Sequence, residues 1–203
     1  MQRKSRLVLI AAILGFVFLY APMVSLVIFS FNKSKLVTVW GGFSTKWYGE
    51  LFQNAQILNA AGLSLRIAVI SASLALVIGT IAAFVLVRFG RFRGRNLLTG
   101  MITSPLVMPD VIIGLSLLLM FVAMQNMIGW PNRGMTTIII AHATFGAAYV
   151  AVVVQSRLRD MDLSVEEAAA DLGASATRVF FDITLPIISP ALISGWLLSF
   201  TLS

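Results

Sequence analysis

One acidic residue lies inside an otherwise uncharged apolar run. Asp110 is the only charged residue between Leu97 and Gly129, and it directly follows Pro109. An ionisable group at that depth in a membrane is costly to bury and marks a functional site by default. A carboxylate there would attract a cation and replace part of its water shell. Alternatively, it would cap a helix that restarts after the proline. The two roles can coexist, so Asp110 is the candidate residue of a cation pathway.

The remaining polar groups predict no catalysis. His142 is the single histidine, there is no cysteine, and a lone histidine in an apolar run is more often a hydrogen-bonded interior residue than a site. The chain has no paired carboxylates at one depth, no serine with a neighbouring base and no phosphate-binding G-x-x-x-x-G-K-[ST] loop. We therefore predict that the chain is not an enzyme, holds no metal and binds no cofactor, ATP included.

The second informative pattern lies in residues 166–186, EEAAADLGASATRVFFDITLP, the longest polar interruption between two apolar runs in the C-terminal half. It fixes seven positions at defined spacing: Glu167, Ala168, Ala169, Gly173, Ile183, Leu185 and Pro186. The two alanines leave room for another protein to dock closely, and the glycine permits a tight turn between two short helices. The isoleucine and leucine can pack back into a bundle, and the proline would end the loop. A lone glutamate on such a helix is otherwise usually just a solvated residue.

The elements that must position these residues are membrane helices. The 203 residues are 59% hydrophobic and 11% charged, whereas soluble domains carry about 25% charged residues. About 20 helical residues cross a bilayer core about 30 Å thick. We therefore predict an all-α membrane protein with four spans and the opening of a fifth, over residues 7–31, 63–87, 97–127, 135–156 and 187–203. The sequence stops inside the fifth apolar run, so we expect a truncated chain that lacks a C-terminal span.

Two of these spans have unusual compositions. The second is rich in alanine, glycine and serine, which let helix backbones approach closely, either inside the bundle or against a partner. The third is interrupted by Pro105 and Pro109, and proline breaks or kinks a helix. We expect a helix to restart at Asp110.

The distribution of basic residues predicts the orientation, because cytoplasmic loops carry an excess of lysine and arginine. With the N-terminus in the cytoplasm, ten basic residues fall inside: Arg3, Lys4, Arg6, Arg88, Arg91, Arg93, Arg95, Arg157, Arg159 and Arg178. The other five, Lys33, Lys35, Lys46, Arg66 and Arg133, fall outside or at the outer rim. Residues 160–186 are then cytoplasmic. The basic loop 88–95 is interpreted as a topology determinant rather than as a contact for lipid headgroups or a partner.

The pattern over 166–186 resembles the EAA loop of permease subunits in binding-protein-dependent ATP-binding-cassette importers. Further segments make the chain similar to the polyamine permeases within that family: FLYAPM (18–23), FNKSKLVTVW (31–40), STKWYGEL (44–51), VLVRFGRFRG (85–94), PLVMPD (105–110), GLSLLL (114–119), YVAVV (149–153) and ISGWLLSFTLS (193–203). The resemblance implies a single type I (MetI-like) permease domain over 1–203, with residues 160–186 as its coupling segment. It also implies that Asp110 lies along the solute pathway.

The same resemblance implies a function and a set of partners. The chain would be a permease subunit of an ATP-driven putrescine importer in the bacterial inner membrane, forming half of the pathway. A second permease subunit, a dimeric ATPase that uses ATP and Mg, and a periplasmic polyamine-binding protein would complete it, in contact with lipid and without nucleic acid. Glu167 would pair with a basic residue of the ATPase. The alternatives are a permease for another small solute and a non-transporting scaffold that recruits an ATPase.

The outer segment between the first two spans has two interpretations. A surface helix over roughly 44–53 would help to seat the binding protein. Alternatively, Trp40, Trp47 and Tyr48 form an aromatic belt that anchors the chain at headgroup depth. Both roles are compatible with one another.

Overall fold

The computed structural model describes residues 2–36 and 38–203, with side chains from residue 6 onward within those ranges. Its regular structure in these ranges is helical, apart from one isolated bridge between Asn32 and Phe43. The chain divides into two compact units that meet between residues 62 and 63. Within the described ranges, five helices are long and apolar enough to cross a membrane: Arg6–Ser30, Ala55–Arg88, Asp110–Ile128, Met135–Asp160 and Ala176–Thr201.

The first unit holds α1 (Gln2–Ser30), which continues through Pro22, and the short helix α2 (Lys46–Gln53). The loop between them is organised by buried Asn32. Its amide nitrogen donates to the carbonyl of Val39 at 2.7 Å, and its side-chain oxygen accepts from the Gly41 N–H at 2.8 Å. The Trp47 indole donates to the Asn32 carbonyl at 2.8 Å, which ties α2 to the end of α1. The surface helix expected over 44–53 thus exists and begins at Lys46.

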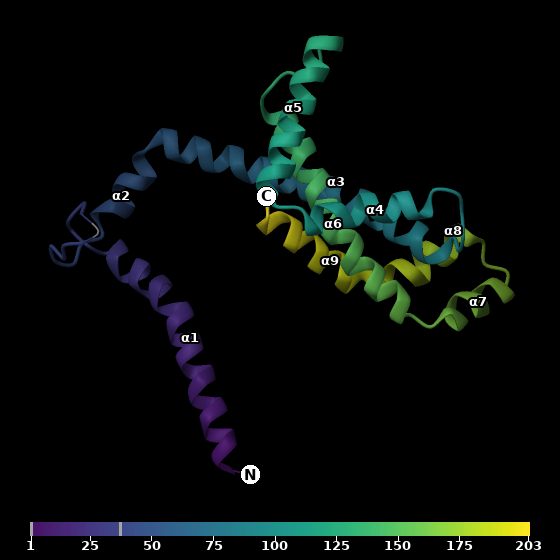
Figure 1. Ribbon diagram of the computed structural model, residues 1–203, viewed down its shortest axis with the longest axis horizontal. Helices are drawn as coiled ribbons and strands as arrows, with labels where there is room; N and C mark the ends of the chain where they lie inside the picture. The colour runs from purple at the N-terminus through teal and green to yellow at the C-terminus, as the bar shows by residue number, and fades with distance from the viewer. Residues whose placement is uncertain (1, 37) are drawn as a thin grey trace. The chain divides into compact units, whose positions relative to one another are not determined.

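The second unit begins within α3 (Ala55–Arg88), at residue 63. It is built around the remainder of α3, α6 (Met135–Asp160) and α9 (Leu185–Thr201), of which α6 and α9 run side by side in Figure 1. The fully buried residues of its core are Ala75, Ala83, Val150, Val154, Leu158 and Ile188. α3 begins eight residues before the span that the sequence predicted at residue 63. Its last two turns hold Leu86, which packs with Ile102 and Ala151 in a second cluster.

Small residues set how closely these helices approach. A Cβ added at Gly79 of α3 would lie 2.7 Å from the carbonyl oxygen of Ala147 and 2.7 Å from the Cβ of Val150. A Cβ at Gly146 would collide with the Ser199 hydroxyl of α9 and lie 3.1 Å from Ala75. The small residues of the second span therefore face α6 and α9 of the same chain, which is the first of the two packing arrangements considered from the sequence.

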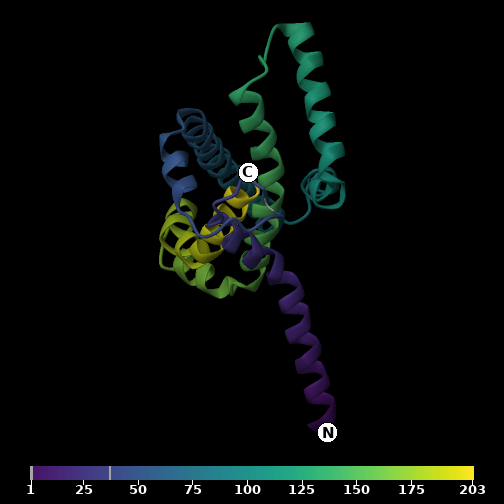
Figure 2. The same cartoon turned by 90° about the vertical axis from the view of Figure 1, so that its left-hand side faces the viewer.

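The third apolar run is divided into two helices, α4 (Arg95–Val107) and α5 (Asp110–Ile128). Met108 between them is extended, with φ −79° and ψ 142°, as expected for a residue before proline. Pro105, in contrast, lies within α4 without ending it. Figure 2 shows α5 and α6 as a hairpin. The helix thus restarts at Asp110, as the sequence predicted.

The segment after α6 contains α7 (Leu163–Asp171), a turn at Gly173, and α8 (Ala176–Val179). α8 continues without a break through a π-helical turn, η1 (Phe180–Thr184), into α9. The two short helices expected here are present. The sequence places Pro186 at the end of the loop, whereas in the structure it is the second residue of α9, inside the helix that runs without a break from Ala176 to Thr201.

Candidate functional site

Two residues singled out from the sequence line one cavity. Asp110 at the start of α5 and His142 on α6 border an open space of about 220 Å³, which is also lined by Phe145 and by Leu202 next to the end of α9. The rest of the wall consists of Ile113, Gly114 and Leu117 of α5 and Ala141 of α6. His142 lies about 10 Å and Phe145 about 15 Å along α6 from Met135, at about 1.5 Å per residue. On α6 the cavity therefore lies about two to three turns inside the helix, whereas on α5 it lies at the N-terminal end.

Asp110 does not serve as a helix cap. Pro109 occupies the N-cap position of α5, Asp110 is the first helical residue, and α5 has no side-chain capping hydrogen bond. The capping role considered from the sequence is therefore wrong in this conformation. The carboxylate also makes no hydrogen bond or ion pair with any residue in the described ranges. It still gains from the helix N-terminus, where a negative charge is stabilised by the helix dipole.

His142 also differs from its expectation. The sequence predicted a hydrogen-bonded interior histidine, whereas the half-buried His142 has no hydrogen-bond partner in the part of the chain that the structure describes. Its imidazole borders the same cavity as Asp110. One carboxylate, one imidazole and a mainly apolar wall suit a solute that combines a cationic head with methylene groups, because charge meets the acid and the methylenes meet Phe145 and the aliphatic residues.

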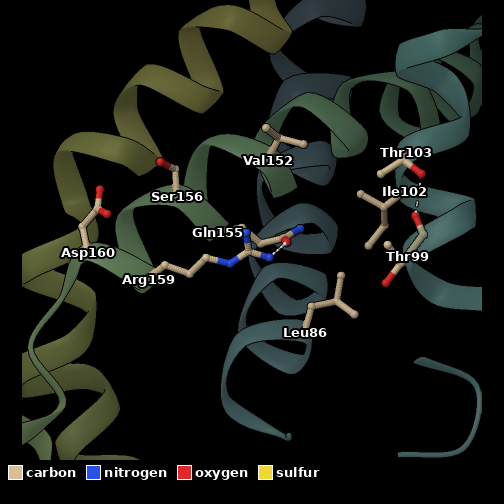
Figure 3. Close-up of a pocket in the computed structure, with 9 residues that line it drawn as sticks. All are labelled: Leu86, Thr99, Ile102, Thr103, Val152, Gln155, Ser156, Arg159 and Asp160. Carbon is tan, nitrogen blue, oxygen red and sulfur yellow. Dashed lines mark hydrogen bonds between the residues drawn. The ribbon is translucent and has the colours of Figure 1, made fainter. Parts of the chain in front are cut away.

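A larger cavity of about 370 Å³ lies elsewhere in the same unit, among α3, α4 and α6 (Figure 3). Its polar groups include Thr99 and Thr103 of α4 and Asp160 at the end of α6. Arg159 also borders it and donates to the side-chain oxygen of Gln155 at 3.2 Å. An arginine beside the acid makes this cavity a poorer place for a cation than the one at Asp110, because like charges at close range repel.

The helix that carries the EAA pattern starts with a well-formed cap. Asp162 precedes α7, and its carboxylate accepts a hydrogen bond from the Ser164 N–H at 3.0 Å. Hydrogen bonding from Ser164 lowers the pKa of Asp162 below its usual 3.8. α7 ends at Asp171, and the chain then turns at Gly173, whose φ of +86° is accessible to glycine at little cost. Cap and turn together define a short helix held outside the bundle.

The seven pattern residues fall into two groups in the structure. Glu167 and Ala168 are exposed and Ala169 is half-buried, so α7 presents an accessible small-residue face. Leu172, directly after this helix, is 90% exposed. Ile183 and Leu185 are half-buried rather than central to the core. The buried residues of that stretch are Thr184 and Ile188, which sequence reasoning did not single out.

Sequence reasoning also missed the glutamate that contacts the bundle. Glu166, next to Glu167, forms an ion pair with Arg88 at 3.0 Å and accepts a hydrogen bond from Thr184 at 2.6 Å. Arg88 had been interpreted only as a topology charge of the basic loop. A usable signal was the helical spacing of Glu166 and Ala169, which share the half-buried face of α7 while Glu167 points away.

Comparisons with known proteins identify a family and several relatives that resemble this chain. Residues 75–203 match the family model described as "Binding-protein-dependent transport system inner membrane component". The chain is 65% identical to the putrescine transport system permease protein PotI of Escherichia coli K12, over 96% of the chain and 70% of that protein. It is 40% identical to the spermidine/putrescine transport system permease protein PotC of Escherichia coli K12, over 93% of the chain and 69% of that protein.

A solved structure gives the fold independently. A chain of a bacterial ABC transporter involved in the import of the acidic polysaccharide alginate superposes with a TM-score of 0.70, at 16% sequence identity. The match covers 99% of this chain and 71% of that one. The predicted all-α importer permease fold is thereby confirmed.

Proposed function

This chain belongs to the family of binding-protein-dependent transport system inner membrane components, and from that premise we propose that it is a permease subunit of an ATP-driven putrescine importer. It spans the inner membrane several times and forms one half of the solute pathway, with its N-terminus in the cytoplasm. The excess of arginine and lysine on the side of residues 160–186 supports this orientation. Its similarity to two polyamine permeases supports the solute class.

The observation that carries the proposal is the cavity at Asp110. This residue is the single acidic residue within the apolar runs, it borders an open space between α5 and α6, and it has no ionic partner in the described ranges. Putrescine has an ammonium group at each end of a short methylene chain. One ammonium binds the carboxylate and the methylenes contact Phe145 and Leu117, while the second ammonium is bound by the partner permease across the pathway. No lysine or arginine borders this cavity to oppose a cation.

Energy for transport comes from a partner ATPase. The exposed face of α7, with Glu167 and Ala168, docks on one subunit of the ATPase dimer, which binds ATP and Mg. Glu167 pairs there with a basic residue. A periplasmic polyamine-binding protein delivers the solute, and a second permease subunit completes the pathway. This chain itself binds no nucleotide and catalyses no reaction.

The proposal is tested by uptake of labelled putrescine into vesicles that contain the complete subunit with its partner permease, ATPase and binding protein. Asp110→Asn keeps the size of the side chain and removes its charge. A hydrogen bond to a charged group is worth about 1.5–3 kcal/mol, and about 1.4 kcal/mol corresponds to tenfold in affinity. Because Asp110 is exposed within this chain, we expect the lower end, a roughly tenfold weaker apparent affinity.

The matched control is Asp160→Asn, which removes the carboxylate of the other cavity. It should leave the apparent affinity for putrescine unchanged. Uptake of putrescine that is equal in wild type and Asp110→Asn would remove Asp110 from the pathway. Uptake of another small solute in place of putrescine would support the alternative of a different substrate, and a complex that binds the ATPase but moves no solute would support a scaffold.

A further inference from the structure

We propose that Arg88, Glu166 and Thr184 form a positioning node that sets the orientation of α7 and transmits its movement to the membrane helices. This inference rests on the proposed function, because it assigns to the three residues the coupling between ATPase and pathway. It separates the roles of two adjacent glutamates. Glu167 faces the partner, whereas Glu166 holds the helix to its own bundle.

The node joins three segments that are distant in sequence. Arg88 is the last residue of α3, Glu166 lies in the first turn of α7, and Thr184 is the last residue of the π-helical turn η1. One oxygen of Glu166, Oε1, accepts from the Arg88 guanidinium at 3.0 Å and from the Thr184 hydroxyl at 2.6 Å. The same guanidinium donates to the carbonyl of Leu158, near the end of α6, at 3.5 Å. Three elements therefore meet at one carboxylate, and the guanidinium links a fourth, α6, to it.

The node is largely shielded from water. The side chains of Arg88 and Glu166 are 13% and 17% exposed, and Thr184 is 1% exposed. In such a setting a charge-assisted hydrogen bond is stronger than at the surface, and removing one partner leaves the other buried without compensation. The Nε of Arg88 is already buried without a partner in the described ranges, so this guanidinium depends on Glu166 and Leu158.

Apart from the contacts of Glu166, α7 has few contacts that fix its position. None of its residues is buried, and Leu163 and Val165 expose 49% and 43% of their surface. It connects to α6 through Met161 and Asp162 and to α8 through the turn at Gly173. Because its apolar contacts with the bundle are few, the Glu166 carboxylate fixes how α7 is rotated. That rotation also sets where Glu167 points.

The π-helical turn supplies the third partner. π-helical turns occur often at functional sites. Here Thr184 Oγ1 lies 3.4 Å from the Val179 carbonyl, five residues back, and 2.6 Å from Glu166. The hydroxyl at the end of η1 thus contacts α7 from the base of the span Ala176–Thr201. A push on α7 by the ATPase reaches α9 through Thr184 and α3 through Arg88, and both helices pack on α6, which borders the cavity at Asp110.

The test uses the reconstituted four-component complex and three variants of the node. Glu166→Gln removes the charge, Thr184→Val removes the hydroxyl at constant shape, and Arg88→Gln removes the guanidinium. We expect the ATPase to remain bound in each, while the putrescine moved per ATP hydrolysed falls roughly fivefold or more, the lower end of typical coupling between sites. Thr184→Ser keeps the hydroxyl donor that Thr184→Val lacks, so it should keep the wild-type ratio of putrescine moved to ATP hydrolysed. Arg91→Gln, at an exposed arginine three residues beyond Arg88, should leave it unchanged.

Two further measurements test the contact among Arg88, Glu166 and Thr184 independently of the proposed transport function. The double variant Arg88→Gln with Glu166→Gln should be no worse than either single variant, because contacting residues are not additive. Hydrogen exchange over residues 163–171 should be faster in Glu166→Gln and Arg88→Gln than in wild type and Arg91→Gln, whatever the solute. Additive effects, or wild-type exchange in both variants, would overturn the node. Failure of the wild-type complex to move putrescine, with that exchange pattern present, would instead overturn only the proposed solute.

Discussion

Gly79 offers a direct test of how the second unit packs. It lies on α3 where that helix crosses α6, and a Cβ built on it would be 2.7 Å from the Ala147 carbonyl oxygen and 2.7 Å from the Val150 Cβ. Ordinary contacts between carbon atoms are about 3.5–4.0 Å. Gly79→Ala therefore requires the two helices to separate by about 1 Å, because a backbone carbonyl cannot rotate away.

Two opposing effects determine how much Gly79→Ala changes the free energy of unfolding. Overpacking a close helix contact costs about 1–3 kcal/mol, while replacing glycine by alanine inside a helix recovers about 0.8–1.0 kcal/mol. The expected net loss is about 1 kcal/mol, the difference between the centres of these ranges. For a chain of this size, about 1 kcal/mol shifts Tm by about 2–4 °C. We expect Gly79→Ala to lower Tm by about 2–4 °C on that scale.

The assay is thermal unfolding of the complete subunit in detergent, followed by tryptophan fluorescence. Gly100→Ala in α4 is the matched control, because no atom lies within 4 Å of a Cβ built there. It keeps only the gain in helix propensity, so its Tm should be equal to or above that of wild type. A Tm for Gly79→Ala at or above that of Gly100→Ala would refute the close approach of α3 and α6.

Three further predictions concern the coupling segment. Asp162→Ala should speed amide exchange in the first turn of α7 at neutral pH. Because the Ser164 hydrogen bond lowers the pKa of Asp162, the wild-type cap should persist above pH 3.8 and be lost only as the pH falls through the lowered pKa. Loss of the wild-type cap already at pH 5 would contradict this prediction. Gly173→Asp forces a non-glycine residue to φ +86°, at about 1 kcal/mol, and adds a charge at the docking turn, so membrane insertion should persist while co-purification of the ATPase is lost. If assembly and uptake both survive Gly173→Asp, α7 is not the docking helix. Glu167→Lys should weaken ATPase binding with unchanged exchange in α7, and faster exchange there would show that Glu167, like Glu166, holds the helix.

The helical character of the chain could be predicted from the length of its apolar runs, and the break before Asp110 from Pro109. Both signals are local. A proline removes a backbone donor and restricts the residue before it whatever the tertiary structure. The length of α3 was not predictable in the same way, because its first turns continue beyond the most apolar stretch.

The candidate sites were predictable only in part, because contacts between distant segments decide them. Asp110 was identifiable as a charge in an apolar run, but its sharing of a cavity with His142 depends on how α5 approaches α6. Glu166 and Glu167 are chemically identical in sequence, and helix rotation alone decides which one faces Arg88. The π-helical turn that brings Thr184 to Glu166 has no comparable signature in the local sequence.

The most direct test of the central claim is ATP hydrolysis by the reconstituted complex as putrescine-loaded binding protein is added, in wild type and in Asp110→Asn. We expect stimulation by putrescine in wild type and a clear reduction in the variant, with ATPase assembly equal in both. Equal stimulation in both would contradict a role for Asp110 in the pathway. No stimulation by any polyamine in an intact wild-type complex would contradict the assignment of this chain to polyamine import.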